Sequence, residues 1–261
     1  RERELDNTLV VITSDNGMPF PRCKSNLYDL GTHVPLAVRW PKAVKSGRVV
    51  EDFVSLADLA PTFLEAAGLK PTSAMTGKSF LDILTSGKSG QVDKKRDRVF
   101  TGKERHARVR KEGVGYPMRA VRTKDFLYIR NFEPDRWPAG DPEGSEYNDP
   151  PAPYGDVDMN SPTKDYMLEH RGEFEKLFEM GFGKRDAEEL YDLNKDPDQL
   201  HNAASLVEYS QVKDKLAAVL MAELKSSKDP RVMGRGAIFD SYPYFGGYWR
   251  KKNPQNRPVG K

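Results

Sequence analysis

Hydrophobic residues first gather in two short runs near the start of the chain. Residues 9–12 read Leu-Val-Val-Ile, without polar alternation, and Asp15-Asn16-Gly17 follow as turn formers. A continuous β-branched run of this kind is typical of a strand buried on both faces, as in a parallel α/β sheet. Residues 34–38 form a second apolar run, which predicts the next strand. Pro35 is compatible with this strand, because it lies near the start, where a missing N–H is tolerated.

Apolar positions then change to helical spacing. Residues 55–67 place their apolar side chains on one face, which predicts a helix. Pro61 indicates that the regular helix begins there, after a looser turn, and Gly68 is a natural stop. A second, short helix is predicted over residues 78–85.

Short strand patterns dominate the next part of the chain. Residues 131–163 are rich in Pro, Gly, Asp and Tyr, which indicates an ordered long loop, and residues 206–226 predict a long amphipathic helix. Strands are predicted at residues 98–101, 118–122, 126–130 and 188–193, with a hairpin turn at 123–125. We therefore expect an α/β part over residues 1–95. An α+β subdomain, with a short antiparallel sheet, a long helix, a long loop and a tail, is expected over residues 96–261.

Composition excludes several classes of protein. The chain has 261 residues and a net charge of +3, and its 42 basic residues are interleaved with 39 acidic ones, so it does not have the pattern of a nucleic-acid-binding protein. No window of eighteen uncharged apolar residues predicts a membrane span, and the charged first residues do not form a signal peptide. The single cysteine, Cys23, excludes a disulfide within the chain and a cysteine-based metal cluster.

The polar residues after the first strand suggest a metal site. Ligands of open α/β sheets bind beyond the carboxyl ends of strands, where Asp15 and Asn16 are expected. Carboxylate and amide oxygens are hard ligands that suit Ca²⁺ or Mg²⁺, but two ligands cannot hold an ion that takes about 6–8 oxygens. The alternative is a simple Asn-Gly turn.

Lys24 lies eight residues after Asn16. A divalent cation would repel its ammonium group unless an anion lay between the two positive charges. The pattern is therefore compatible with an anionic substrate, and the alternative is an exposed loop lysine. Gly31 fits a turn in which the backbone enters the next strand.

These residues belong to a series of motifs in a recognisable order. The series comprises residues 13–17, 24–28 with Gly31 and 34–36, then 56–62, 77–80, 102–106, 116–120, and 189–193 with Asp196-Pro197 and Asn202-Ala203. In order and spacing, the series resembles the later part of the sulfatase family, within the alkaline phosphatase-like superfamily. The resemblance runs from about Thr8 to about Ala204 and is closest to the heparan N-sulfatase (sulfamidase)-like subgroup.

The resemblance implies a fold and a set of site residues. The fold would be the C-terminal part of an alkaline phosphatase-like α/β sandwich, followed by a small α+β domain. Asp15 and Asn16 would be ligands of the catalytic divalent cation, usually Ca²⁺, with Mg²⁺ as the alternative. Lys24 would act in catalysis by contacting the sulfate oxygens. Arg105 and His106 would face the substrate, although His106 can equally be an ordinary surface histidine.

The nucleophile of the family is missing from the sequence. Sulfatases use a formylglycine made from Cys or Ser in a C/S-x-P-S/A-R motif, whereas Cys23 is followed by Lys24-Ser25-Asn26. The paired aspartates and the assisting Lys and His of the family are also absent. We therefore expect the chain to be the C-terminal portion of a longer enzyme, to need the N-terminal portion of that enzyme as its partner, and to be inactive alone.

The expected reaction is hydrolysis of sulfate esters or N-sulfate groups on a sulfated small molecule or, more specifically, a glycan. By resemblance the enzyme would be periplasmic, secreted or lysosomal. One alternative is a phosphodiesterase or phosphonate hydrolase of the same superfamily. The other is a noncatalytic module that binds sulfated glycans through its basic residues Lys103, Arg105, His106, Arg108 and Arg110.

Overall fold

The computed structural model describes residues 4–147, 152–157 and 161–244, and it divides the chain into two compact units. The first unit comprises the residues up to Ser14 together with Pro35–Val99. The second comprises Asp15–Val34 together with the residues from Phe100 onward. The segment with the predicted metal ligands and Lys24 therefore groups with the later part of the chain. The functional division expected between residues 95 and 96 stays a prediction.

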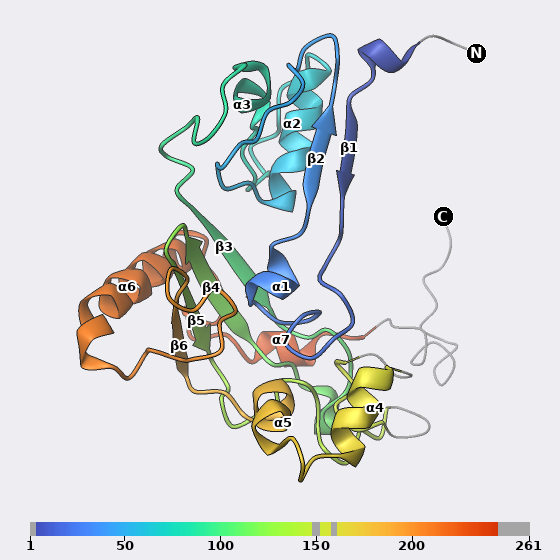
Figure 1. The fold of residues 1–261 in the computed structure, drawn as a ribbon, viewed down its shortest axis with the longest axis vertical. Helices are drawn as coiled ribbons and strands as arrows, with labels where there is room; N and C mark the ends of the chain where they lie inside the picture. Colours follow the sequence, from blue (N-terminus) through green and yellow to red (C-terminus); the bar gives the residue numbers. More distant parts are fainter. Residues whose placement is uncertain (1–3, 148–151, 158–160, 245–261) are drawn as a thin grey trace. The chain divides into compact units, whose positions relative to one another are not determined.

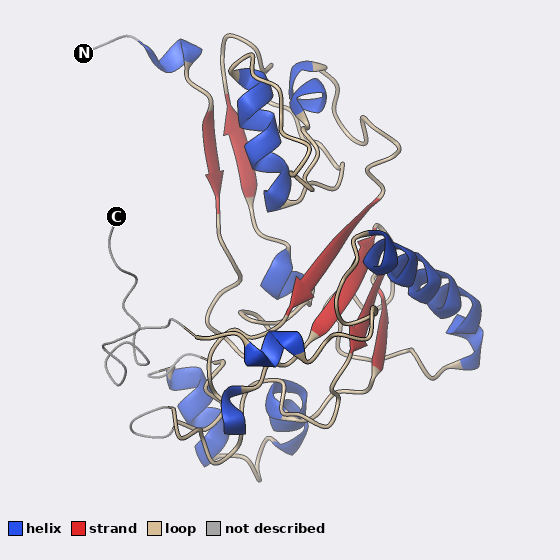
Figure 2. Ribbon diagram, turned by 180° about the vertical axis from the view of Figure 1, so that it is seen from behind, coloured by secondary structure: helices blue, strands red, loops and turns tan. Residues whose placement is uncertain are grey.

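The described residues of the first unit form a two-stranded sheet, two α-helices and two 3-10 helices (Figure 1). Its elements are η1 (Glu4–Asn7), β1 (Val10–Thr13), β2 (Leu36–Arg39), η2 (Leu56–Asp58), α2 (Leu59–Ala66) and α3 (Leu81–Thr85). Figure 2 shows α2 lying along β2, and Phe80, Ile83 and Leu84 form the small core with side chains of both.

The expectation of a buried parallel strand at the start of the chain was wrong. β1 pairs antiparallel with β2, with Val10 opposite Arg39 and Thr13 opposite Leu36. Ile12 is 67% exposed. A β-branched run indicates side chains that fit a pleated strand. The direction of the partner strand, and the burial of each face of the sheet, depend on residues far away in the sequence.

Asp58 explains two of the recognised motifs. Its carboxylate accepts hydrogen bonds from the backbone N–H of Ser55 at 3.1 Å and of Lys78 at 2.7 Å, and from Arg96 Nη1 at 2.9 Å. A Cβ on Gly77 would lie 2.1 Å from the carbonyl oxygen of Ala57, so only glycine permits this approach. The motifs at residues 56–62 and 77–80 therefore join two turns of the first unit.

The second unit is built on a four-stranded sheet in the order β3-β4-β5-β6. Its strands are β3 (Arg98–Lys103), β4 (Met118–Thr123), β5 (Phe126–Asn131) and β6 (Glu188–Asp192). β5 pairs antiparallel with both β4 and β6, which confirms the predicted hairpin and the small antiparallel sheet.

The two faces of this sheet are covered by different parts of the chain. On one face, Leu216, Leu220 and Leu224 of α6 (Ser210–Ser226) pack against Val121, Tyr128 and Leu190. Figure 1 shows α6 running along the sheet, as the predicted long helix should; η4 (Val207–Tyr209) precedes it. On the other face, Leu27 and Tyr28 pack among Met118, Ala120, Leu127 and Ile129. The alternation of side chains along β4 and β5 thus buries both faces.

Several elements of the second unit were not predicted. α4 (Pro162–Glu169) begins at the end of the expected long loop, and α5 (Glu175–Phe182) follows it. Phe178 and Phe182 of α5 pack against Tyr154 from that loop. The remaining short helices are α1 (Asp29–Thr32), η3 (Lys111–Gly113) and α7 (Ile238–Ser241). Among the helices that the structure describes, none has the length and apolar composition to cross a membrane.

Candidate functional site

The candidate site lies in the segment from Asp15 to Val34, whose two ends are held together by backbone. The N–H of Gly17 donates to the carbonyl oxygen of Gly31 at 3.2 Å. A Cβ on Gly17 would lie 2.1 Å from the carbonyl oxygen of Leu30, and one on Gly31 would lie 2.3 Å from that of Cys23. Both glycines are therefore required for close backbone approach, which refines the turn predicted at Gly31.

The three residues predicted for metal and sulfate binding lie in this one segment. Asp15 is exposed, and Asn16 and Lys24 are half-buried. The N–H of Lys24 donates to the carbonyl oxygen of Met18 at 3.0 Å, and the side chain of Asn26 donates to the Lys24 carbonyl at 3.1 Å. The backbone of Lys24 is thus fixed close to the turn that carries Asp15 and Asn16.

Asp15 and Asn16 would supply only part of a metal site. Their oxygens suit a hard divalent cation, which takes about 6–8 oxygen ligands. Over the residues that the structure describes, no group of three or more His, Cys, Asp or Glu side chains is arranged to hold a metal ion. The donor chemistry therefore fits a hard cation such as Ca²⁺ or Mg²⁺, but these two side chains do not complete a coordination sphere.

Cys23, next to Lys24, does not have the surroundings of a reactive nucleophile. Its side chain is buried, and burial raises the pKa of the thiol. A buried thiol with a raised pKa is a weak nucleophile, because the thiolate is the reactive form. Cys23 therefore contributes to packing of the segment.

Arg105 and His106 follow β3. The guanidinium group of Arg105 donates to the carbonyl oxygens of Gly113 at 3.0 Å and of Tyr242 at 2.6 Å. His106 is exposed. A role of either residue in substrate binding stays a prediction.

Two of the basic residues that the sequence offered for binding sulfated glycans, Lys103 and Arg110, are buried in an internal ion-pair cluster. Lys103 Nζ lies 3.0 Å and Arg110 Nη2 lies 2.7 Å from the same oxygen, Asp156 Oδ2, and all three side chains are buried. Burial alone would raise the pKa of Asp156, but the charges of Lys103 and Arg110 lower it to about 2. These two cations are therefore committed to an internal ion pair with a residue far along the chain.

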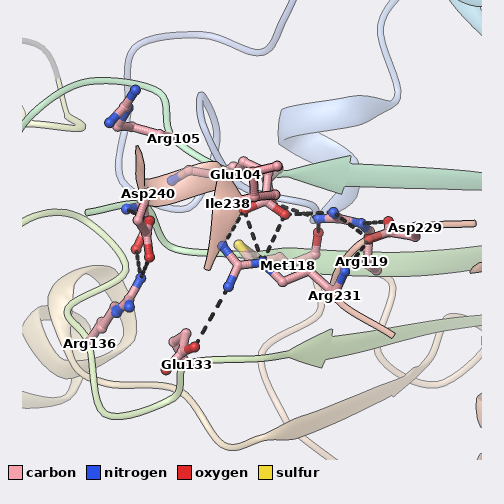
Figure 3. Close-up of polar contacts among 12 residues, drawn as sticks. Glu104, Arg105, Met118, Arg119, Glu133, Arg136, Asp229, Arg231, Ile238 and Asp240 are labelled. Carbon is pink, nitrogen blue, oxygen red and sulfur yellow. Dashed lines mark hydrogen bonds and ion pairs between the residues drawn. The ribbon is translucent and has the colours of Figure 1, made fainter. Parts of the chain in front are cut away.

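A second group of ion pairs holds residues 229–240 against the sheet and the loops beside it (Figure 3). Glu104 lies between Arg119, at 2.6 Å, and Arg231, at 2.7 Å, and Arg119 also pairs with Asp229 at 2.6 Å. Asp240 pairs with Arg136 at 3.1 Å and accepts from the N–H of Gly115. The sequence predicted a tail after the long helix but not these contacts, because they are polar and show no hydrophobic period.

Comparison with known proteins places the chain among sulfatases. A family model described as "N-sulphoglucosamine sulphohydrolase, C-terminal" matches residues 23–145. An ulvan-active sulfatase of Formosa agariphila is 31% identical over 86% of this chain and 39% of its own length. The human N-sulphoglucosamine sulphohydrolase is 29% identical over 98% of this chain and 47% of its own length.

The extracellular sulfatase SULF-1 homolog of Drosophila melanogaster is 38% identical over 32% of this chain and 8% of its own length. The chain thus spans less than half the length of each of these relatives.

Solved structures show the same fold at lower identity. One, in complex with its substrate D-glucosamine-2-N,6-O-disulfate, has a TM-score of 0.56 at 23% identity, over 88% of this chain and 37% of that one. The phosphonate monoester hydrolase of Agrobacterium radiobacter has a TM-score of 0.53 at 22% identity, over 85% and 36%. The fold is therefore alkaline phosphatase-like, as predicted. Within that class, the chain belongs to the sulfatase family and carries the C-terminal portion of a sulfatase.

Proposed function

We propose that this chain is part of an enzyme that hydrolyses sulfate esters or N-sulfate groups on a glycan. The observation that carries the proposal is the segment Asp15–Val34, in which the N–H of Lys24 donates to Met18, two residues after Asn16, at 3.0 Å, and the N–H of Gly17 donates to Gly31 at 3.2 Å. The names of the relatives support sulfated sugars as the substrate class, since they include an N-sulphoglucosamine sulphohydrolase and an ulvan-active sulfatase.

Each residue has a distinct task in the proposed reaction. Asp15 and Asn16 would hold Ca²⁺, or Mg²⁺ in its place, together with ligands from the rest of the enzyme. The bound cation would supply positive charge beside the sulfate oxygens. Lys24 would donate hydrogen bonds to those oxygens and stabilise their charge as the bond to sulfur breaks. A formylglycine nucleophile would come from outside this chain.

The compartment follows the same reasoning. Among the periplasmic, secreted and lysosomal settings that the resemblance implies, a relative named as an extracellular sulfatase supports the secreted one. The noncatalytic polyanion-binding alternative is disfavoured, because two of its five basic residues, Lys103 and Arg110, are buried against Asp156.

Calorimetric Ca²⁺ titration and a 4-nitrocatechol sulfate assay test the proposal on two samples, this chain and the complete enzyme. We expect turnover and Ca²⁺ binding by the complete enzyme. We expect neither turnover nor tight Ca²⁺ binding by the chain, because the nucleophile and the remaining metal ligands would lie outside it. Turnover by the chain alone would show that another residue does the chemistry.

A phosphonate ester, tested as a second substrate, distinguishes the proposed sulfatase from a phosphonate hydrolase. The fold is shared with a phosphonate monoester hydrolase, so fold does not choose between sulfate and phosphonate. If the complete enzyme cleaves the phosphonate ester with a higher kcat/KM than the sulfate ester, the phosphonate hydrolase assignment replaces the one proposed here.

A further inference from the structure

The segment that carries Lys24 is fastened to the sheet of the second unit through consecutive residues, Tyr28 and Asp29. Tyr28 OH donates to Glu189 Oε2 at 2.7 Å, and both residues are buried. The same carboxylate accepts from Tyr191 OH at 2.7 Å and from Asn131 Nδ2 at 2.7 Å. Burial and the negative charge of Glu189 raise the pKa of Tyr28 to about 12, so the phenol stays a donor at neutral pH. Three donors on one buried carboxylate offset the cost of removing its charge from water.

Asp29 forms the second attachment, to β4. Arg122 Nε lies 2.9 Å from Asp29 Oδ1, and Arg122 Nη2 lies 2.8 Å from Asp29 Oδ2. Two parallel hydrogen bonds between a guanidinium and a carboxylate fix orientation as well as distance. The side chains are about four-fifths buried, at 19% and 21% exposure, so solvent screens the pair less than it would at the surface.

Gln199 forms the third attachment, from the turn after β6. Its Oε1 accepts from the N–H of Asp29 at 2.9 Å, and its carbonyl oxygen accepts from Arg22 Nη2. The guanidinium of Arg22 also lies over the ring of Tyr28, 3.9 Å from its centroid. Gln199 is 2% exposed and has a φ of +58°, a conformation uncommon for residues other than glycine. The protein thus tolerates a strained residue at the point where the segment is held.

The attachments reach the site through a few backbone hydrogen bonds. Tyr28 accepts from the N–H of Gly31, whose carbonyl oxygen accepts from Gly17, the residue after Asn16. Lys24 lies two residues from Arg22 and bonds to Met18 beside Gly17. A displacement of Tyr28 and Asp29 would therefore be carried to both the predicted ligand turn and Lys24.

We propose that Arg122, Glu189 and Gln199 are positioning residues for the reaction, which hold the Lys24 segment in its productive place. The inference rests on the proposed function and adds a task for the C-terminal sheet: it sets the geometry of the sulfate-binding lysine. Displacements of about 1 Å at a reacting centre can cost about a hundredfold in rate, so a rigid attachment has a direct kinetic effect.

The test compares Arg122→Gln with Arg130→Gln. Arg130 lies on the neighbouring strand β5 and pairs with Glu188 at 3.6 Å, at 40% exposure, and strand alternation places it on the face opposite Ile129, which packs with the segment. In this chain, we expect Arg122→Gln to speed amide hydrogen exchange at Gly17, Lys24 and Gly31 by about tenfold or more, and Arg130→Gln to leave it unchanged. In the complete enzyme, Arg122→Gln should lower kcat by about tenfold or more while KM changes by less than about threefold.

Two further variants keep the test decisive. Arg122→Lys retains the charge but not the paired hydrogen bonds, and it replaces Arg122→Gln if that variant does not fold. Gln199→Ala removes the acceptor for the Asp29 N–H and should give the same two effects. Unchanged exchange in the segment, or an equal loss of kcat in Arg130→Gln, would overturn the proposal.

The two experimental arms also separate this inference from the proposed function. If the complete wild-type enzyme cleaves no sulfate ester, the proposed function fails, whereas the exchange measurement on this chain still decides whether Arg122 and Gln199 hold the segment. If the enzyme is active and only the kinetics are unaffected by the variants, the positioning role fails and the proposed function stands.

Discussion

At the scale of single residues, buried charge separates structural from functional roles. Lys103 and Arg110 belong to the basic stretch that the sequence offered as a surface for polyanions, yet both point to the buried carboxylate of Asp156. Lys24, by contrast, lies half-buried in the segment with the predicted metal ligands. The two lysines have the same side chain, but the surroundings of Lys103 give it a structural role, whereas the catalytic role of Lys24 stays a prediction.

Asp156→Asn should destabilise the second unit by about 3–5 kcal/mol, because it leaves two buried cations without their partner. The exposed pair of Arg171 and Glu179, at 59% and 54% exposure, offers the control Glu179→Gln, which should cost less than about 1 kcal/mol. Denaturant unfolding of both variants measures the difference. Equal losses would mean that the Asp156 cluster contributes no more than a surface ion pair.

The same carboxylate should give the stability a pH dependence. The pKa of Asp156 is lowered to about 2 in the folded chain, against about 3.9 when unfolded. Its contribution is therefore complete above about pH 4 and is lost as the pH falls toward 2. Repeating the unfolding measurement across this window should show the difference between wild type and Asp156→Asn shrinking as the pH falls.

Lys24→Ala should lower kcat of the complete enzyme by more than about tenfold, because one preorganised donor to the sulfate oxygens is lost. Lys70→Ala changes an exposed lysine of the first unit and should leave kcat unchanged. Steady-state kinetics with 4-nitrocatechol sulfate measure both. Wild-type kinetics in Lys24→Ala would remove Lys24 from the site.

At the scale of elements, local patterns predicted what local forces control. The β4–β5 hairpin and α6 were foreseen, because alternation and helical spacing express faces that each element buries within a short stretch of chain. α4 and α5 were missed, since the phenylalanines of α5 pack against Tyr154 in what the sequence showed only as a polar loop. The direction of β1 was missed because pairing is decided by a distant partner.

The turn around Gly31 offers a test at this scale. Gly31→Ala should disrupt the segment, because a Cβ would lie 2.3 Å from the carbonyl oxygen of Cys23 and 2.5 Å from that of Asn26. Gly172→Ala is the matched control, since its Cβ would have nothing within 4 Å. Hydrogen exchange at Lys24 should speed up by about tenfold or more in Gly31→Ala alone. Protection equal to that of wild type would show that the backbone can relax around the added atom.

At the scale of the whole molecule, the chain is two units whose membership does not follow sequence order. Residues 15–34 leave the first unit between its two strands and join the second, where Leu27 and Tyr28 complete one face of the four-stranded sheet. The predicted site is therefore built onto the C-terminal sheet. This arrangement makes the later part of the chain the support for the predicted residues Asp15, Asn16 and Lys24.

The sequence by itself determined the family, the hairpin, the long helix and the candidate residues Asp15, Asn16 and Lys24, because motifs and periodicity are written in neighbouring positions. Tertiary structure alone decided that β1 and β2 run antiparallel, that Lys103 and Arg110 are buried against Asp156, and that Asp29 meets Arg122 and Gln199. Each of these outcomes depends on a partner far along the chain. Such pairings are fixed by the burial of apolar surface and by the cost of leaving a buried charge unpaired, and no short window of sequence records either.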